Sequence, residues 1–167
     1  MSGNSRNFVE DRMASGHTTR FEIDLDAILH NLQQIRQCIG DSVELMPVVK
    51  ANAYGHGAIE VARAAAEAGA NRIGVARVME GVQLREAGIV LPIVILAYAI
   101  PDEMPLIVRF DLTPTITEFS VAERLSALAV AARKIISTHL KVDTGMGRYG
   151  WLPDEVVPNL KIFAALP

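Results

Sequence analysis

The chain has 167 residues, half of them hydrophobic, and its formal net charge at pH 7 is -3. This length allows one domain with an ordinary hydrophobic core, and the small negative charge argues against a surface for nucleic acid or an anionic membrane. A small metabolite is therefore the expected partner. The single cysteine, Cys38, cannot form an internal disulfide, which fits a reducing cytoplasm. We expect Cys38 to fill the core from the apolar face of a helix.

Residues 1–20 are polar, show no hydrophobic periodicity and lack the apolar region of a secretion signal. They are predicted to form a disordered leader. The longest apolar stretch, 89–100, contains Pro92 and is too short to cross a bilayer. The sequence therefore predicts a soluble protein.

From residue 21 onward the sequence alternates between strand-like and helix-like periodicity. Residues 21–24 can pair as a short strand, and apolar residues then recur at helical spacing from Leu25 to Ile39, where Gly40 ends the helix. The strands expected after this helix are 44–50, 72–77, 93–97, 112–117 and 135–143. The helices expected between these strands are 58–68, 79–87, 101–110 and 118–134.

The expected strands begin roughly 20–28 residues apart, which is the length of a strand plus a crossover helix. The pattern predicts an α/β fold built from right-handed βα units on a parallel sheet. A doubly wound sheet and a (β/α)8 barrel both have such units. The dinucleotide-binding sheet places Gly-x-Gly-x-x-Gly after its first strand, and no such spacing follows the first expected strand. A whole barrel needs about 250 residues, so a partial barrel is expected.

Lys50 ends the first of these apolar runs, in the segment Met-Pro-Val-Val-Lys-Ala-Asn-Ala-Tyr-Gly-His-Gly at 46–57. Strand alternation directs Met46, Val48 and Lys50 to one face, and the C-terminal ends of parallel strands are where active sites form. A lysine amine desolvated by apolar neighbours can attack an aldehyde cofactor such as pyridoxal phosphate and hold it as an imine. Considered alone, however, a lysine at the end of a strand is more often a solvated residue.

Residues 50–57, Lys-Ala-Asn-Ala-Tyr-Gly-His-Gly, closely resemble the cofactor-lysine signature of alanine racemases, whose catalytic domain is a (β/α)8 barrel. The resemblance implies that Lys50 carries pyridoxal 5'-phosphate and acts in catalysis. It also implies that Tyr54 donates a hydrogen bond to the cofactor's phosphate. Gly55 and Gly57 are read as turn residues, and His56 as a structural loop residue.

A second stretch, His-Leu-Lys-Val-Asp-Thr-Gly-Met-Gly-Arg-Tyr-Gly at 139–150, resembles the same family. By that resemblance Arg148 contacts the phenolic oxygen of the cofactor, and Lys141, carbamylated in some members, orients Arg148. Without the resemblance, Asp143 and Arg148 suggest a local salt bridge around a glycine turn. Tyr149 stands where the family often has an aliphatic residue, and we assign it no role.

The resemblance extends from about residue 21 to 150, and it implies that 21–167 is an incomplete alanine racemase N-terminal barrel domain of about five βα units. The implied complete enzyme is a cytoplasmic homodimer without a metal, which supplies D-alanine for peptidoglycan. Its second proton donor, a tyrosine of the C-terminal domain, is expected beyond Pro167. Residues 163–167 continue a helical pattern, so we expect an interrupted chain.

Three interpretations stay open. The chain is the N-terminal part of an alanine racemase and is inactive alone, or it is a non-catalytic fragment that serves as a folding or assembly module. As a third possibility, it belongs to a related pyridoxal-phosphate enzyme, such as a broad-specificity racemase or a decarboxylase. Binding of pyridoxal phosphate separates the first from the second, whereas the amino-acid specificity is not encoded in the motifs described above.

Overall fold

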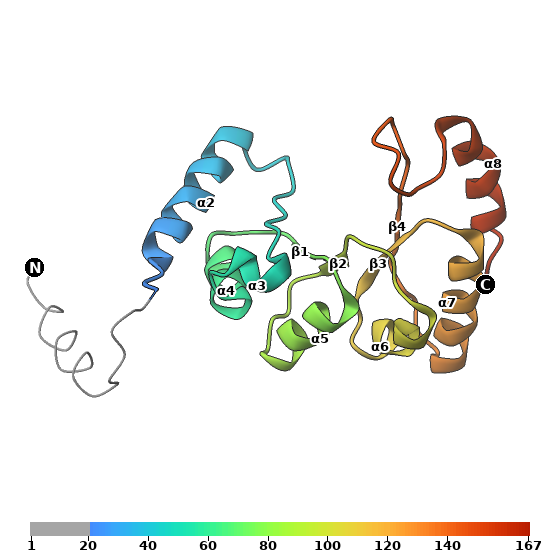
Figure 1. Cartoon of the computed structure of the whole chain (residues 1–167), viewed down its shortest axis with the longest axis horizontal. Coiled ribbons are helices and arrows are strands. Elements are labelled where there is room, and N and C mark those ends of the chain that lie inside the picture. The colour runs from blue at the N-terminus through green and yellow to red at the C-terminus, as the bar shows by residue number, and fades with distance from the viewer. Residues whose placement is uncertain (1–20) are drawn as a thin grey trace, which may run out of the picture.

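The computed structural model describes residues 21–167, so the predicted leader at 1–20 lies outside the described part (Figure 1). The elements are α2 (Leu25–Ile39), α3 (Lys50–Tyr54), α4 (Ala58–Glu67), β1 (Ile73–Val75), α5 (Val78–Glu86), β2 (Ile93–Ile95), η1 (Pro101–Glu103), α6 (Met104–Arg109), β3 (Thr113–Ile116), α7 (Phe119–Ala132), β4 (His139–Leu140) and α8 (Pro153–Phe163). Within 21–167, no helix combines the length and apolar character needed to cross a membrane.

The sheet is parallel throughout, with the strand order β1-β2-β3-β4. Val48 forms an isolated parallel bridge with Gly74, so the segment before Lys50 lies beside β1 as the start of a further strand. A helix follows each of the strands β1 to β3 before the next one begins. The chain is therefore a consecutive series of βα units, as the spacing of the apolar runs predicted.

The two faces of the sheet have different environments. Helices α4, α5 and α6 lie along one side of the row of strands, and the main core fills the space between them (Figure 1). Val75 and Ile95 belong to this core and have no exposed surface. A Cβ atom placed on Gly74 would instead lie 3.1 Å from Val48 and 3.2 Å from Leu96, so these two side chains occupy the opposite face. This face, which we call the inner face, is the one that a closed barrel would enclose.

Several expectations about individual segments are wrong. The strand expected at 135–143 is reduced to β4 (His139–Leu140) and an isolated bridge at Val142. Residues 21–24 form no strand, because Asp24 instead caps α2, its side chain accepting a hydrogen bond from Ala27 N at 2.9 Å. The strand expected at 44–50 is reduced to the bridge at Val48, because the backbone turns at Lys50. Cys38 is exposed rather than part of the core, since α2 buries none of its residues.

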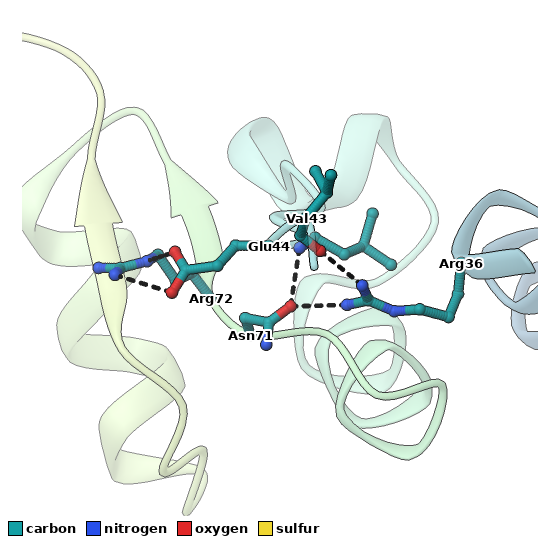
Figure 2. A network of polar contacts seen from close by, with 6 residues as sticks. Arg36, Val43, Glu44, Asn71 and Arg72 are labelled. Atoms are coloured by element: carbon teal, nitrogen blue, oxygen red, sulfur yellow. Dashed lines mark hydrogen bonds and ion pairs between the residues drawn. The ribbon is translucent and has the colours of Figure 1, made fainter. Parts of the chain in front are cut away.

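Hydrogen bonds attach α2 to the segments that precede Val48 and β1 (Figure 2). The Arg36 guanidinium donates to the carbonyl oxygen of Val43 at 2.6 Å and to Oδ1 of Asn71 at 2.6 Å. Beside them, Arg72 and Glu44 form an ion pair at 2.6 Å. This ion pair lowers the pKa of the Glu44 carboxyl below its usual value, chiefly through the hydrogen bond from Arg72. These contacts fix the segment that leads toward Lys50.

Candidate active site

The backbone changes hand immediately after Lys50. Ala51, Asn52, Ala53 and Tyr54 all have φ angles between 50° and 56°, so α3 contains a left-handed helical turn. For L-residues this conformation costs roughly 1–2 kcal/mol each, and a run of four requires tertiary contacts that hold it. The sequence predicts a turn here but not its handedness, because alanine and tyrosine seldom adopt positive φ.

The left-handed turn brings together two residues that the sequence predicts to act on one cofactor. The Nζ atom of Lys50 lies 5.8 Å from the centroid of the Tyr54 ring, within the range of a cation–π contact. Lys50 is half-buried, whereas Tyr54 is 62% exposed. An amine and a phenol therefore stand side by side at the C-terminal end of the first strand segment.

Side chains within the motif support the turn. Oδ1 of Asn52 accepts a hydrogen bond at 2.9 Å from the backbone N–H of Ala58, the first residue of α4. This contact satisfies one of the N–H groups that a helix leaves without a partner. Nδ1 of His56 lies 2.9 Å from the carbonyl oxygen of Ala53. The asparagine and the histidine thus hold the backbone, which agrees with the structural role expected for His56.

Glu80 on α5 also reaches the turn, although neither sequence motif includes it. Its Oε1 accepts a hydrogen bond from Ala51 N at 2.7 Å. Its Oε2 accepts from Ala76 N at 2.8 Å and from Arg77 N at 2.9 Å. A glutamate at the third position of a helix is a recognisable capping signal, which could have predicted the bond to Arg77. The bond to Ala51 depends on tertiary structure and has no local signal.

The loop at 143–150 is organised by Asp143. Its Oδ1 accepts hydrogen bonds from Gly145 N at 2.9 Å and Gly147 N at 3.0 Å. These backbone N–H groups hold the pKa of the Asp143 carboxyl below its ordinary value, and the charge of Lys141 adds to the effect. Within residues 21–167 no ion pair joins Asp143 to Arg148, so the local salt bridge considered from the sequence is wrong.

Two backbone hydrogen bonds close the base of this loop. Asp143 N donates to Trp151 O, and Trp151 N donates to Lys141 O, both at 2.9 Å. A Cβ atom on Gly150 would lie 2.8 Å from the carbonyl oxygen of Lys141, so only glycine fits there. Residues 145–150 do have the Gly-x-Gly-x-x-Gly spacing, but they follow β4 and two of their amides are bound by Asp143. The loop is therefore not a dinucleotide-binding turn.

Tyr149 connects the same loop to the middle of the sheet. Its hydroxyl donates a hydrogen bond at 2.8 Å to the carbonyl oxygen of Leu96, just after β2. Because the strands are parallel, the ends of β2 and of the Val48 segment lie at the same edge of the sheet. The Arg148 loop and the Lys50 turn therefore lie at the same edge. Tyr149, to which we assigned no role, makes this connection.

The structure does not join the other two predicted site residues to each other. Arg148 is exposed, and its guanidinium carbon lies 6.0 Å from the ring centroid of Tyr149. Lys141 is half-buried after β4. No hydrogen bond links Lys141 to Arg148 within the part of the chain that the structure describes. Together the described side chains offer an amine for a carbonyl group and a phenol and a guanidinium for anionic oxygens.

Comparisons with known proteins agree with this geometry. The family described as alanine racemase, N-terminal domain, matches residues 23–167. The alanine racemase of Desulforamulus reducens is 48% identical over 134 residues, which are 80% of this chain and 36% of that protein. The alanine racemase of Halothermothrix orenii is 44% identical over 140 residues, with 84% of this chain and 37% of that protein covered.

Solved structures lead to the same family. Alanine racemase from Clostridium difficile 630 superposes with a TM-score of 0.84 at 32% identity, covering 87% of this chain and 38% of that one. The Bacillus anthracis enzyme with bound L-Ala-P gives 0.76 at 33% identity, with 89% and 40% covered. The chain thus spans well under half the length of these relatives, and its arc of βα units is the partial (β/α)8 barrel that the sequence predicted. The chain belongs to the alanine racemase N-terminal domain family.

Proposed function

We propose that this chain is the cofactor-binding N-terminal part of a pyridoxal-phosphate-dependent alanine racemase, an enzyme that interconverts L-alanine and D-alanine. The observation that carries the proposal is the left-handed turn that sets the Lys50 amine 5.8 Å from the Tyr54 ring, at the end of a strand segment. Relatives at 48% and 44% identity that are named alanine racemases support alanine as the substrate rather than a broader set of amino acids.

The residues present fit pyridoxal 5'-phosphate. Lys50 offers an amine for the aldehyde, and the exposed Tyr54 can donate a hydrogen bond to the phosphate. The Arg148 side chain makes no hydrogen bond within 21–167, so it is free to donate to the phenolic oxygen. When bound, the cofactor would withdraw electrons from the substrate's Cα–H bond and so make that proton easier to remove.

Lys50 Nζ would then exchange the proton at Cα on one face of alanine. Inversion also needs a group on the opposite face, and the family resemblance assigns that task to a tyrosine of the C-terminal domain. A general acid–base group typically contributes about 10²–10⁴-fold to a rate. We therefore propose that 21–167 by itself binds the cofactor but does not racemise alanine.

Lys141 is proposed to orient Arg148. A Cβ atom on Gly150 would lie 2.8 Å from Cγ of Lys141, so the stem of Lys141 packs against the loop two residues beyond Arg148. A carbamate on Lys141 would replace a cation that repels the guanidinium by an anion that accepts its hydrogen bonds. The complete enzyme is proposed to be a cytoplasmic homodimer that supplies D-alanine for the cell wall, with no metal and no nucleic-acid or membrane partner.

A complementation assay tests the proposal. The 167-residue chain is incubated with pyridoxal phosphate and L-alanine, alone and with the separately expressed C-terminal region of the Desulforamulus reducens relative, and D-alanine is measured by chiral chromatography. We expect D-alanine only from the mixture, none from Lys50→Ala, and full activity from Lys161→Ala on α8. D-alanine from the isolated chain, sensitive to Lys50→Ala, would contradict the requirement for a second part.

The non-catalytic alternative has its own outcome. Within 21–167 the Val48 segment pairs with a strand on one side only, and β4 (His139–Leu140) is the last strand of the sheet, with only a bridge from Val142 to Trp151 beyond it; such edges favour pairing with another chain. We therefore expect the isolated chain to self-associate. If it takes up no pyridoxal phosphate, with or without the C-terminal region, the racemase proposal fails and an assembly module remains.

A further inference from the structure

We propose that Glu80 is a positioning residue for Lys50, because its carboxylate fixes the peptide that follows the lysine and thereby the direction of the amine. The inference rests on the proposed function only in taking Lys50 as the cofactor lysine. Glu80 itself lies on α5, 29 positions after Ala51 in the sequence, and it is the only residue outside the motif with a described side-chain bond to the turn.

The bond to Ala51 supplies something that the turn cannot provide for itself. The first N–H groups of any helical turn have no acceptor within it. In this turn the first N–H bonded internally is that of Ala53, which donates to Val49 O at 2.8 Å. Ala51 N donates instead to Oε1 of Glu80 at 2.7 Å. Glu80 therefore completes the start of the left-handed turn from outside.

Lys50 is held from both sides by this arrangement. Before it, Val49 N donates to Gly74 O at 2.8 Å, which is the bridge to β1. After it, Ala51 N is held by Glu80, and Glu80 is itself held by two N–H groups at the end of β1. The first fixed point is on β1, and the second is anchored to the two residues directly after it. A change at the second point would rotate the backbone of Lys50 and displace its long side chain from the Tyr54 ring.

Two substitutions separate this role from helix capping. Glu80→Asp keeps the negative charge and can still cap α5, but it is one methylene too short to bond Ala51 as well. Glu80→Gln keeps the length, but its NH₂ group must face an N–H donor whichever way the amide is turned. Glu86→Gln is the matched control, because Glu86 is exposed on the same helix and its side chain makes no hydrogen bond within 21–167.

Amide hydrogen exchange of the 167-residue chain without cofactor is the first measurement. We expect Glu80→Asp and Glu80→Gln to speed exchange at 51–57 by about tenfold or more, as loss of a hydrogen bond to a charged group implies, with β3 unchanged. The second measurement is the rate at which borohydride fixes pyridoxal phosphate to Lys50. We expect both variants to lower this rate by about tenfold or more, and Glu86→Gln to leave both readouts unchanged.

Each outcome decides the inference. Unchanged exchange at 51–57 in both Glu80 variants would overturn it, and so would an equal increase at β3, which would make Glu80 a general stabiliser. Faster exchange with an unchanged rate of fixation would also overturn it, because the turn would then not direct the amine. If the unaltered chain fixes no cofactor at Lys50, the proposed function fails instead, and exchange alone decides whether Glu80 holds the turn.

Discussion

The hydroxyl of Tyr149 donates a hydrogen bond to the carbonyl oxygen of Leu96 at 2.8 Å, across 53 positions of sequence. The bond joins the loop after β4 to the end of β2 and passes over the intervening strand β3. Arg148 is the immediate neighbour of Tyr149, so its position depends on a contact that lies two strands away. The tyrosine is therefore a determinant of how the loop is placed.

Tyr149→Phe should loosen this loop without unfolding the chain. The substitution keeps the ring beside Arg148 and removes only the hydrogen bond, for which we expect a cost of about 1 kcal/mol. Faster amide exchange at 143–150 and weaker retention of pyridoxal phosphate would follow. Tyr98→Phe is the control, since no hydrogen bond to the Tyr98 hydroxyl occurs among the described residues. Equal behaviour of the two variants would show that the bond to Leu96 does not hold the loop.

Lys50→Ala should abolish the attachment of pyridoxal phosphate that borohydride makes permanent. Mass mapping of peptides from the treated chain measures it. Lys134 is a poor competitor, because its Nζ donates to Val108 O at 2.7 Å and to Arg109 O at 3.3 Å. A modified peptide that contains Lys134 or Lys141 in place of Lys50 would refute the assignment.

Arg148→Ala should weaken cofactor retention, or slow turnover in the complemented enzyme, far more than Arg133→Ala does. Loss of a charge-assisted hydrogen bond is worth about 1.5–3 kcal/mol, or roughly 10- to 150-fold. Arg133 ends α7, is exposed and makes no side-chain hydrogen bond within 21–167, so its removal tests charge alone. Small and equal effects from both would reduce Arg148 to a residue of the turn. Cofactor retention is measured by the absorbance that remains after dialysis.

Acid should loosen the loop through Asp143. Its pKa in the folded chain lies below that of an unfolded aspartate, about 3.9. Its contribution to stability is therefore complete above that value and is lost as the pH falls through the lower folded pKa. Trp151, the single tryptophan, reports on this by fluorescence because its backbone closes the loop.

Asp143→Asn should show the altered Trp151 fluorescence already at neutral pH, with a smaller change on acidification, while Asp102→Asn behaves as the unaltered chain. Far-UV circular dichroism recorded in parallel separates loop opening from global unfolding. A fluorescence change that always coincides with loss of helix signal would contradict the local origin of the effect.

Arg85 should be costly to replace. Its guanidinium donates to four backbone carbonyl oxygens, those of Ile89, Leu91, Phe110 and Asp111. Burial lowers the pKa of this guanidinium, and the Asp111 charge opposes that shift. Arg85→Lys cannot reproduce the fork of donors, so we expect a loss of about 2–3 kcal/mol in urea unfolding. Arg124→Lys, exposed on α7, should cost nothing measurable.

The sequence predicted the elements whose periodicity is strong. The apolar spacing from Leu25 to Ile39 and the run Ile93–Ile95 both correspond to elements of the structure. Prediction from the sequence failed where tertiary contacts determine the conformation of the backbone or the face on which a residue lies. Val75 and Ile95 pack under the helices whereas Val48 lies on the inner face, and this could not be predicted because the register between strands is not written in any one strand.

The sequence also predicted part of the candidate site. The motifs identified Lys50 and Tyr54, and the structure brings them together. The bonds from Glu80 and Tyr149 were not foreseen, since each joins segments far apart in sequence through a backbone atom, which leaves no pattern of residue types. Whether Arg148 and Lys141 act on a cofactor stays a prediction.

The left-handed turn also has a consequence for short peptides taken from this region. A synthetic peptide of residues 46–57 would contain the whole motif but neither Glu80 nor Gly74. In such a peptide, Ala51 and Ala53 would relax to right-handed or extended backbone. No tertiary contact would offset the conformational cost of the left-handed form, roughly 1–2 kcal/mol per residue. Antibodies raised against such a peptide would therefore recognise the unfolded chain in preference to the native one.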